Sequence, residues 1–231
     1  MLYSPEQEAR FFLIWCHGTA EDIGTRHMTF VTLSRQLQTH ILVFEYPSYG
    51  LSNGVVSSPS EASINDRAQR VYLFICHTIK WPTDRIIIYG HSLGSGPACH
   101  LASTQSVGGL ILQSPYTSIK NLVREAVGSY SNLLWVSYWD NNEAMQHITC
   151  PTLFIHGQRD GLIRFEHSQI LFNLFNHTNQ KELVLLPNDD HNSISITVIL
   201  MHTKAFLNKY FQSITEPMPE VNINQGFRQP Y

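Results

Sequence analysis

The sequence lacks the features that mark several large classes of protein. Lys and Arg do not outnumber Asp and Glu (15 against 18) and form no basic stripe, so nucleic acid is not an expected partner. No apolar run reaches the ~20 residues that span a bilayer. Residues 1–10 also lack the basic segment of a signal peptide. We therefore expect a cytoplasmic protein.

Cysteine is scarce, and its spacing excludes the common metal sites. The chain has four cysteines, Cys16, Cys76, Cys99 and Cys150, without a Cys-x-x-Cys pair. Three of them lie in apolar segments, which favours buried free thiols in a reducing compartment. The twelve histidines include no His-Glu-x-x-His motif and no cluster with zinc spacing. We expect no metal and no other cofactor.

What the chain does have is a regular alternation of strand and helix patterns. Continuous apolar runs at 11–16, 41–45, 86–89, 109–113, 151–155 and 182–186 are typical of strands buried on both faces. Helical patterns lie between them, which predicts an α/β fold with a mainly parallel sheet and helices on both faces. The length suits a single domain over residues 1–214. Residues 215–231 are expected to form a disordered tail, with order along the surface as the alternative.

The start of the helix after the second strand can be read from Ser58-Pro59-Ser60-Glu61. Ser58 is expected to cap the helix, and Glu61 to reach back to the backbone three residues before it. Apolar residues then recur at steps of three and four over 64–79, so one face of this helix is expected to cover the sheet.

One turn is the leading candidate for chemistry. The strand at 86–89 runs into Gly90-x-Ser92-x-Gly94, and a helical stretch follows. A serine on such a strand–turn–helix has a strained backbone conformation. The turn leaves little space beside it, so the flanking residues must be glycine or another small residue. Its hydroxyl then stands clear of the sheet at the start of the helix. Ser92 is the predicted nucleophile, and a tightly packed glycine turn without chemistry is the alternative.

Two later strands end in residues that can activate this serine. Asp160 follows the strand at 151–155, and His191 follows the strand at 182–186. The carboxyl ends of parallel strands meet at one edge of a sheet, so the three side chains are expected to converge there. The order Ser, Asp, His is that of α/β-hydrolase triads. His191 would be the general base, and Asp160 would orient it.

Each of these residues has a simpler interpretation. Asp160 could be an ordinary turn residue, and His191 a solvated loop histidine. Asp189 and Asp190 are rival acids, although a carboxylate adjacent in sequence to the histidine is poorly placed to orient it.

The oxyanion hole is expected to consist of two backbone N–H groups. Leu93 follows the nucleophile, and Thr19 lies in the loop after the first predicted strand. His17 and His156 stand near these turns and are expected to order them rather than to take part in catalysis.

Five segments together resemble one branch of the α/β-hydrolases. They are His17-Gly18-Thr19-Ala20-Glu21-Asp22-Ile23-Gly24, Tyr46-x-x-Tyr49-Gly50-x-Ser52, Ile88-Tyr89-Gly90-His91-Ser92-Leu93-Gly94, Leu112-Gln113-Ser114-Pro115-Tyr116-Thr117-Ser118-Ile119 and Pro151-Thr152-Leu153-Phe154-Ile155-His156-Gly157-x-x-Asp160. This branch includes the Bem46-like proteins and the domain-containing-17 group of protein depalmitoylases. The resemblance runs from about residue 11 to 211. It implies an α/β-hydrolase fold and a serine hydrolase, and the depalmitoylase group implies thioester cleavage on membrane-bound proteins.

The chain departs from this branch in several places. Thr19 stands where the branch has asparagine, and Asp190 stands where glycine is usual. The N-terminal cysteine cluster of the depalmitoylases is absent. The first predicted strand begins at Phe11, so the two strands that usually precede it are expected to be missing, either in a minimal version of the fold or because the natural start lies upstream.

The longest insertion, residues 116–148 between the fourth and fifth predicted strands, is expected to form a short cap. Its apolar residues are Leu133, Leu134, Trp135, Val136, Tyr138 and Trp139. We expect Leu134 and Trp135, together with Tyr116, to line a groove for an acyl chain. Packing of the cap onto the sheet is the alternative.

Taken together, these patterns predict a serine hydrolase of acyl esters or thioesters, with a protein depalmitoylase as the favoured subtype. The expected partner is an acylated protein, a lipid or another ester, which leaves peripheral membrane association open. A small-ester carboxylesterase, a lysophospholipase and a serine peptidase are the alternatives among enzymes. Outside enzymes, the alternative is an inactive member that binds an acylated partner.

Overall fold

The computed structural model describes residues 1–5, 8–19, 21, 23–50, 58–127, 138–177, 179–211 and 218–221. Within these residues, seven strands form one sheet in the order β1-β3-β2-β4-β5-β6-β7. The strands are β1 (Leu2–Tyr3), β2 (Phe11–Cys16), β3 (Thr39–Val43), β4 (Ile86–His91), β5 (Gly109–Gln113), β6 (Thr152–Gly157) and β7 (Lys181–Leu186). All neighbouring strands are parallel except β1 and β3. The predicted α/β architecture with a mainly parallel sheet is confirmed.

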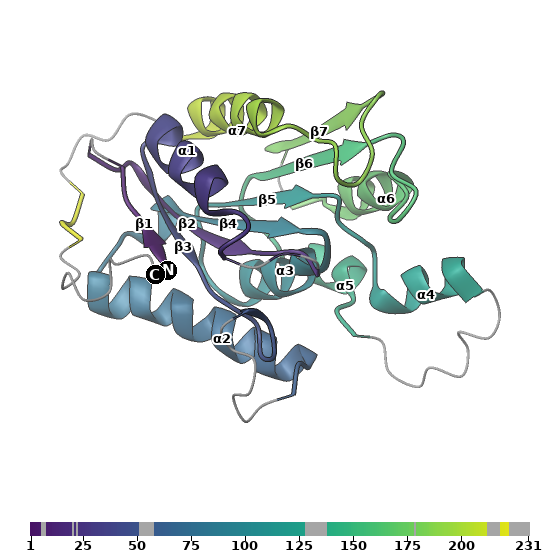
Figure 1. Ribbon diagram of the computed structural model, residues 1–231, viewed down its shortest axis with the longest axis horizontal. Helices are drawn as coiled ribbons and strands as arrows, with labels where there is room; N and C mark the ends of the chain where they lie inside the picture. The colour runs from purple at the N-terminus through teal and green to yellow at the C-terminus, as the bar shows by residue number, and fades with distance from the viewer. Residues whose placement is uncertain are drawn as a thin grey trace.

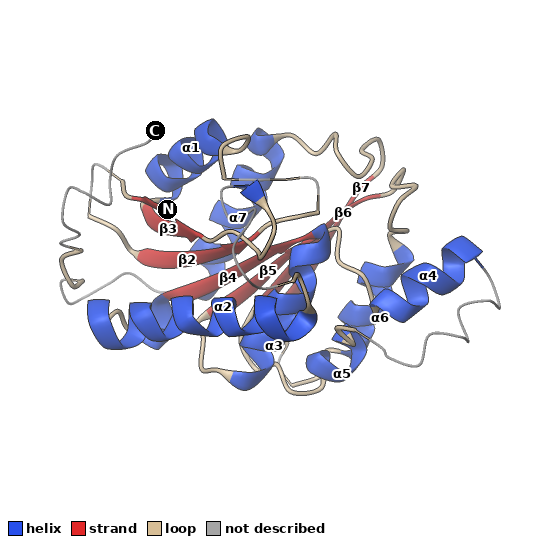
Figure 2. Cartoon of the chain, turned by 60° about the horizontal axis from the view of Figure 1, so that its bottom comes forward, coloured by secondary structure: helices blue, strands red, loops and turns tan. Residues whose placement is uncertain are grey.

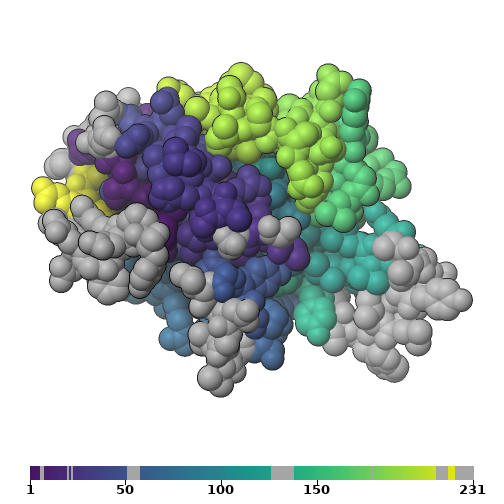
Figure 3. Space-filling model, viewed as in Figure 1, coloured from purple at the N-terminus to yellow at the C-terminus, as the bar shows by residue number. Residues whose placement is uncertain are grey.

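Helices cover both faces of the sheet (Figure 1, Figure 2). They are α1 (His27–Leu37), α2 (Glu61–Leu73), α3 (Ser95–Thr104), α4 (Ile119–Val127), α5 (Asn141–Met145), α6 (Glu166–Leu174) and α7 (Ile196–Tyr210). On one face α1 and α7 lie side by side, as the space-filling view shows (Figure 3). The opposite face carries α2, α3, α5 and α6, while α4 lies toward the carboxyl ends of the strands (Figure 2).

The two faces of the sheet belong to two separate apolar clusters. In β2, Phe12 and Ile14 lie in the cluster under α2 and α3, whereas Leu13 and Trp15 lie in the cluster under α1 and α7. Every residue of β2 and of β4 is buried. Because both faces are covered, these strands appear in the sequence as continuous apolar runs rather than as alternating ones.

The strand order brings the loop after β2 to the nucleophile turn. β4 lies between β2 and β5, and Cys16 at the end of β2 pairs with Gly90 near the end of β4. The chain leaves both strands at the same edge of the sheet. The two segments predicted to hold the nucleophile and the oxyanion donor therefore begin side by side.

The edge strand beside β3 differs from the prediction. A short strand, β1, does precede β2, and it pairs antiparallel with β3 through Leu2–Leu42 and Tyr3–Ile41. The expectation that both preceding strands are missing is corrected to this extent. Two residues are too few to produce a recognisable period in the sequence.

The start of α2 also differs from the prediction. Ser60, not Ser58, is the N-cap, and its Oγ accepts the Ser63 N–H at 3.1 Å while Ser63 Oγ accepts the Ser60 N–H at 3.0 Å. Glu61 instead accepts the backbone N–H of Trp139 at 3.1 Å. A serine, Ser63, thus takes the N3 place that a capping box usually gives to Glu or Gln, while Glu61 is the first residue of the helix.

Most of the predicted tail, residues 215–231, lies outside the described residues. Of the part that the structure describes, Met218 and Val221 pack against the core cluster under α2 and α3. The division into one domain and a disordered tail stays a prediction.

Ile88 offers a test of this core. Its side chain is fully buried in the centre of β4. We expect Ile88→Ala to lower the free energy of unfolding by about 2–5 kcal/mol, because the deleted atoms leave a cavity. The matched control is Met201→Ala on the exposed side of α7, which should change it by less than about 0.5 kcal/mol. Urea denaturation measures both values, and equal effects of the two substitutions would contradict the packing.

Candidate active site

The nucleophile turn has the strained geometry that its glycines suggest. β4 ends at His91, a short 3-10 helix covers Ser92–Gly94, and α3 follows directly. Ser92 has a positive φ of 52°, a conformation that costs energy for a residue with a side chain. A Cβ atom on Gly90 would lie 2.7 Å from the carbonyl oxygen of Gly94, and one on Gly94 would overlap the carbonyl oxygen of Cys16. Both glycines are therefore required by close backbone contacts.

Ser92, His191 and Asp160 form one continuous hydrogen-bonded chain. His191 Nε2 lies 3.0 Å from Ser92 Oγ, and His191 Nδ1 lies 2.6 Å from Asp160 Oδ2. All three residues are buried, with 5–8 % of their surface exposed. The structure thus brings together three side chains that are up to 99 positions apart in the sequence.

The turns that carry Asp160 and His191 are tied to each other. The Gln158 N–H donates to the Leu186 carbonyl at 2.8 Å, and the Arg159 N–H donates to the Asp189 carbonyl at 2.9 Å. A Cβ on Gly157 would overlap that same Asp189 carbonyl. The carboxyl ends of β6 and β7 therefore hold the acid and the histidine at a fixed separation.

Asp160 is set up to remain ionised. Its Oδ1 accepts the backbone N–H groups of Leu162 at 2.9 Å and Ile163 at 2.8 Å, so it also orders its own turn. Burial raises the pKa of Asp160, but the hydrogen bonds from His156, His191 and the Ile163 N–H together hold it well below its ordinary value of 3.8. The turn-residue interpretation and the interpretation as an orienting acid therefore apply to the same carboxylate, through different oxygens.

The rival acids, Asp189 and Asp190, form hydrogen bonds within the loop that carries His191. The Oδ1 of Asp190 accepts the N–H groups of Asn192 and Ser193, each at 2.9 Å, and thereby shapes the loop around His191. Asp189 accepts a hydrogen bond from Ser193 Oγ at 3.3 Å. Both aspartates lie on the outside of this loop, in intermediate to exposed positions.

His156 and His17, which are expected to order turns, both bond to nearby backbone carbonyls. His156 Nδ1 lies 2.7 Å from Ser168 Oγ, and its Nε2 donates to the Ile163 carbonyl at 2.8 Å. His17 Nδ1 lies 2.9 Å from the Gly18 carbonyl oxygen, and its ring stacks on Tyr46 at 3.8 Å.

A cavity of about 310 Å³ opens directly beside Ser92. Its lining consists of Thr19, Ser92, Leu93, Tyr116, Ile119, Leu122, Val123, Leu162 and Ile163. The two residues predicted to supply oxyanion N–H groups, Thr19 and Leu93, thus lie with the serine around one space. Tyr116 also lines it, and its hydroxyl donates to the Leu93 carbonyl at 3.3 Å.

The apolar wall of this cavity comes from residues that the sequence patterns did not single out. Ile119, Leu122 and Val123 project from one side of α4, and Leu162 and Ile163 follow Asp160. Leu162 is 69 % exposed at the mouth of the cavity. A signal was present, since apolar residues spaced by three and four on α4 mark one apolar helix face.

The predicted acyl-groove residues Leu134 and Trp135 lie outside the described residues. Their neighbour Trp139 is buried elsewhere: its Nε1–H donates to Asn65 Oδ1 at 2.9 Å, on α2. For Trp139, packing of the cap onto the body is therefore the correct interpretation.

A second buried carboxylate lies beside the nucleophile turn. Glu21 Oε1 is 2.9 Å from His91 Nδ1 and also contacts the Arg26 guanidinium, while Oε2 accepts the Gly18 N–H at 3.1 Å. Burial raises the pKa of Glu21, but the opposite effect of His91, Arg26 and the Gly18 N–H is larger. The pKa is therefore about 2, below the ordinary value of 4.5. No sequence pattern marks this residue as part of the site.

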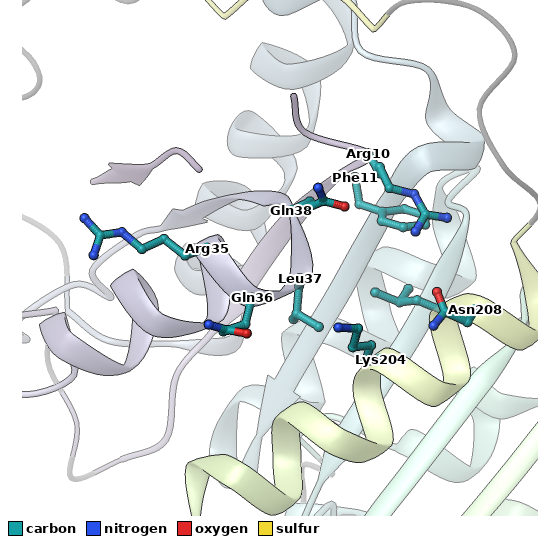
Figure 4. A pocket seen from close by; sticks show the side chains of 9 residues that line it. Arg10, Phe11, Arg35, Gln36, Leu37, Gln38, Lys204 and Asn208 are labelled. Atoms are coloured by element: carbon teal, nitrogen blue, oxygen red, sulfur yellow. The ribbon is translucent and has the colours of Figure 1, made fainter. Parts of the chain in front are cut away.

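A larger cavity of about 460 Å³ lies at the amino ends of the strands, opposite the end that carries Ser92 (Figure 4). Arg10 and Phe11 from the start of β2, Leu37 from the end of α1 and Lys204 from α7 line it. Since these residues lie at the amino ends of the strands, this cavity is separate from Ser92.

Three further properties bear on ligands and on location. The described residues contain no group of three or more His, Cys, Asp or Glu side chains arranged to bind a metal ion. None of the helices in the described ranges combines the length and apolar character that a membrane crossing requires. All four cysteines are free thiols.

The chain is similar to several named proteins. It is 26 % identical to the α/β-hydrolase domain-containing protein aho-3 of Caenorhabditis elegans over 219 residues, which is 94 % of this chain and 64 % of that protein. It is 29 % identical to the human α/β-hydrolase domain-containing protein 17B over 164 residues, 71 % of this chain and 55 % of that protein. Protein bem46 of Schizosaccharomyces pombe is 26 % identical over 230 residues, 97 % and 72 % of the two chains. The chain thus spans about two thirds of the length of aho-3 and little more than half of the length of protein 17B. No model of a known protein family matches it.

Solved structures share the fold. Est1E from Butyrivibrio proteoclasticus, solved with ferulic acid bound, aligns with a TM-score of 0.72 and 19 % identity over 91 % of this chain and 94 % of that one. A soluble variant of monoglyceride lipase from Saccharomyces cerevisiae aligns with a TM-score of 0.67 and 18 % identity over 92 % of each chain.

The sheet order, the nucleophile turn at the end of β4 and these structural likenesses show that the chain has the α/β-hydrolase fold. In sequence the chain is similar to proteins of the branch that contains Bem46 and the domain-containing-17 proteins.

The two buried carboxylates predict a loss of stability in acid. Each has a folded pKa below its unfolded value, so its contribution is complete above about pH 4.5 and is lost as pH falls toward the folded pKa, about 2 for Glu21. We expect the free energy of unfolding to fall between about pH 5 and 2.5, and to fall less steeply in Glu21→Gln. Urea denaturation at a series of pH values measures this, and equal slopes in the variant and the wild type would contradict it.

Proposed function

We propose that the chain is a serine hydrolase that cleaves acyl esters or thioesters, with Ser92 as nucleophile, His191 as general base and Asp160 as its orienting partner. One observation carries the proposal: the hydrogen-bonded chain from Ser92 Oγ through His191 to Asp160 opens on an apolar cavity. Similarity to α/β-hydrolase domain-containing proteins supports it.

The geometry suits a two-step acyl transfer. His191 Nε2, 3.0 Å from Ser92 Oγ, takes the hydroxyl proton as the oxygen attacks the acyl carbon, and the leaving alcohol or thiol then receives that proton. Water repeats the sequence on the acyl-enzyme, with His191 again as base, and releases the acid. Asp160, held ionised, keeps the proton of the neutral imidazole on Nδ1 and stabilises the imidazolium.

Charge that develops on the acyl oxygen needs donors beside Ser92. Leu93 and Thr19 line the cavity at the serine, and we assign the oxyanion hole to their backbone N–H groups. Removal of one such donor typically costs about 3 kcal/mol of transition-state stabilisation.

The cavity favours an apolar acyl group. Aliphatic side chains of α4 and of the turn after Asp160 form one wall, and the exposed Leu162 extends it to the surface. The resemblance to the depalmitoylase group supports a protein depalmitoylase as the subtype, with peripheral membrane association as part of that proposal. A carboxylesterase for shorter esters is the second candidate, because a volume of about 310 Å³ is near the lower end for small-molecule sites.

Substitution of the three residues tests the mechanism. We expect Ser92→Ala to abolish turnover of p-nitrophenyl esters and labelling by a fluorophosphonate probe, and Asp160→Asn to lower kcat by about 10⁴, because the histidine would hold the wrong tautomer. Asp190→Asn is the matched control and should retain kcat within about threefold, since the Oδ1 of asparagine can still accept the Asn192 and Ser193 N–H groups that shape the loop around His191. An unlabelled wild-type protein that binds acylated peptides would instead indicate the inactive binding member.

The cavity wall can be tested by chain length. Leu122→Trp places a large side chain in the cavity, so kcat/KM for octanoyl and palmitoyl esters and thioesters should fall at least about tenfold while that for acetyl esters changes little. Arg124→Trp, on the exposed side of the same helix, is the control. A uniform loss over all chain lengths would contradict an acyl-binding role, and a wild-type preference for acetate would favour the carboxylesterase.

A further inference from the structure

The Glu21 side chain bonds back to the start of the loop after β2. Glu21 Oε2 accepts the Gly18 N–H at 3.1 Å, and the Glu21 N–H donates to the Gly18 carbonyl at 3.4 Å. Gly18 and Glu21 are therefore joined both through the backbone and through the carboxylate. Since the Gly18 N–H is committed to Glu21, it is not available to a substrate, and the next N–H along the chain is that of Thr19, which lines the cavity.

The same carboxylate reaches across to the nucleophile turn. Its Oε1 lies 2.9 Å from Nδ1 of His91, the residue immediately before Ser92, and Arg26 contacts that oxygen from the approach to α1. The Glu21 side chain is 8 % exposed. Hydrogen bonds to an ionised group in such a water-poor place are short and strong, and they rigidify what they connect.

His91 extends this connection to the general base. Its ring lies 5.7 Å from the ring of His191, with 26° between the two planes. A Cβ atom on Gly18 would lie 3.2 Å from His91 Nδ1 and 3.5 Å from Ser92 Cβ, so the loop backbone rests directly on both residues. The oxyanion loop, the nucleophile and the base thus pack around one carboxylate–imidazole pair.

We propose that Glu21, acting through His91, is a positioning residue that fixes the Thr19 N–H at the oxyanion position beside Ser92. The inference rests on the proposed hydrolase function. Oxyanion donors accelerate a reaction to the extent that they are held in place before charge develops. Glu21 is absent from the lining of the cavity, so its loss should weaken transition-state binding and leave substrate binding almost unchanged.

Glu21→Gln is the direct test, because the amide keeps the size of the side chain and removes the charge that engages His91 and Arg26. We expect kcat to fall about tenfold or more with KM within about twofold. The affinity for phenylboronic acid, whose tetrahedral adduct with Ser92 places an oxygen at the oxyanion position, should fall by the same factor as kcat/KM. Glu182→Gln, which removes a surface carboxylate paired with Lys209, is the matched control and should leave both values unchanged.

A second pair of variants keeps the test decisive if Glu21→Gln does not fold. The amide of His91→Gln can still donate to Glu21, whereas His91→Ala cannot, so kcat should be at least partly restored in the glutamine variant relative to alanine. Equal kcat in these two variants, or wild-type kcat and phenylboronic acid affinity in Glu21→Gln, would overturn the positioning role.

The two proposals can fail separately. Wild-type turnover that Ser92→Ala abolishes would uphold the hydrolase function whatever Glu21→Gln does. Wild-type protein without any turnover that depends on Ser92 would overturn both.

Discussion

The close backbone contact between the end of β2 and the turn after β4 is the constraint on which the site depends. The carbonyl oxygen of Cys16 lies where a side chain on Gly94 would have to stand, and Gly90 is closed in by the start of α3. These contacts hold Ser92 in its positive-φ conformation. A strained residue persists only where the surroundings over-determine it, and here strand pairing on both sides of β4 supplies that support.

Two buried carboxylates, Asp160 and Glu21, also hold parts of the site in place. Asp160 and Glu21 each hold two elements together through separate oxygens: Asp160 joins its own turn to His191, and Glu21 joins the loop after β2 to His91. Both carboxylates have a lowered pKa despite their burial, because the hydrogen bonds and charges around them outweigh the loss of solvent. Preorganisation of this kind is what electrostatic catalysis needs, since no group has to reorient when charge develops.

The sequence allowed the prediction of features that repeat along the chain or follow from topology. Strands buried on both faces, such as β2 and β4, were found within about two residues because a short uninterrupted apolar run between turn residues is typical of such strands. The meeting of positions 92, 160 and 191 followed from the rule that parallel strands end at one edge. Shorter or more local features could not be predicted in this way. β1 has only two residues, and the N-cap of α2 is Ser60 rather than Ser58 because Ser60 and Ser63 bond to each other reciprocally.

The apolar cavity beside Ser92 and the role of Glu21 could not be predicted, for a reason that concerns the whole fold. An apolar helix face on α4 is the same pattern whether it covers a core or lines a cavity, and only the position of α4 beyond the sheet decides between them. Leu134, Trp135 and Tyr116 are expected in a groove because large apolar side chains are common in binding sites, and Tyr116 does line the cavity. The same property makes such side chains good packing residues, as Trp139 shows. A glutamate in a loop, likewise, is usually solvated, and it becomes structural only when a histidine and an arginine from other elements close over it. Chemistry that comes from strand order is therefore readable from this sequence, whereas chemistry that comes from which surfaces enclose a space is readable only from the fold.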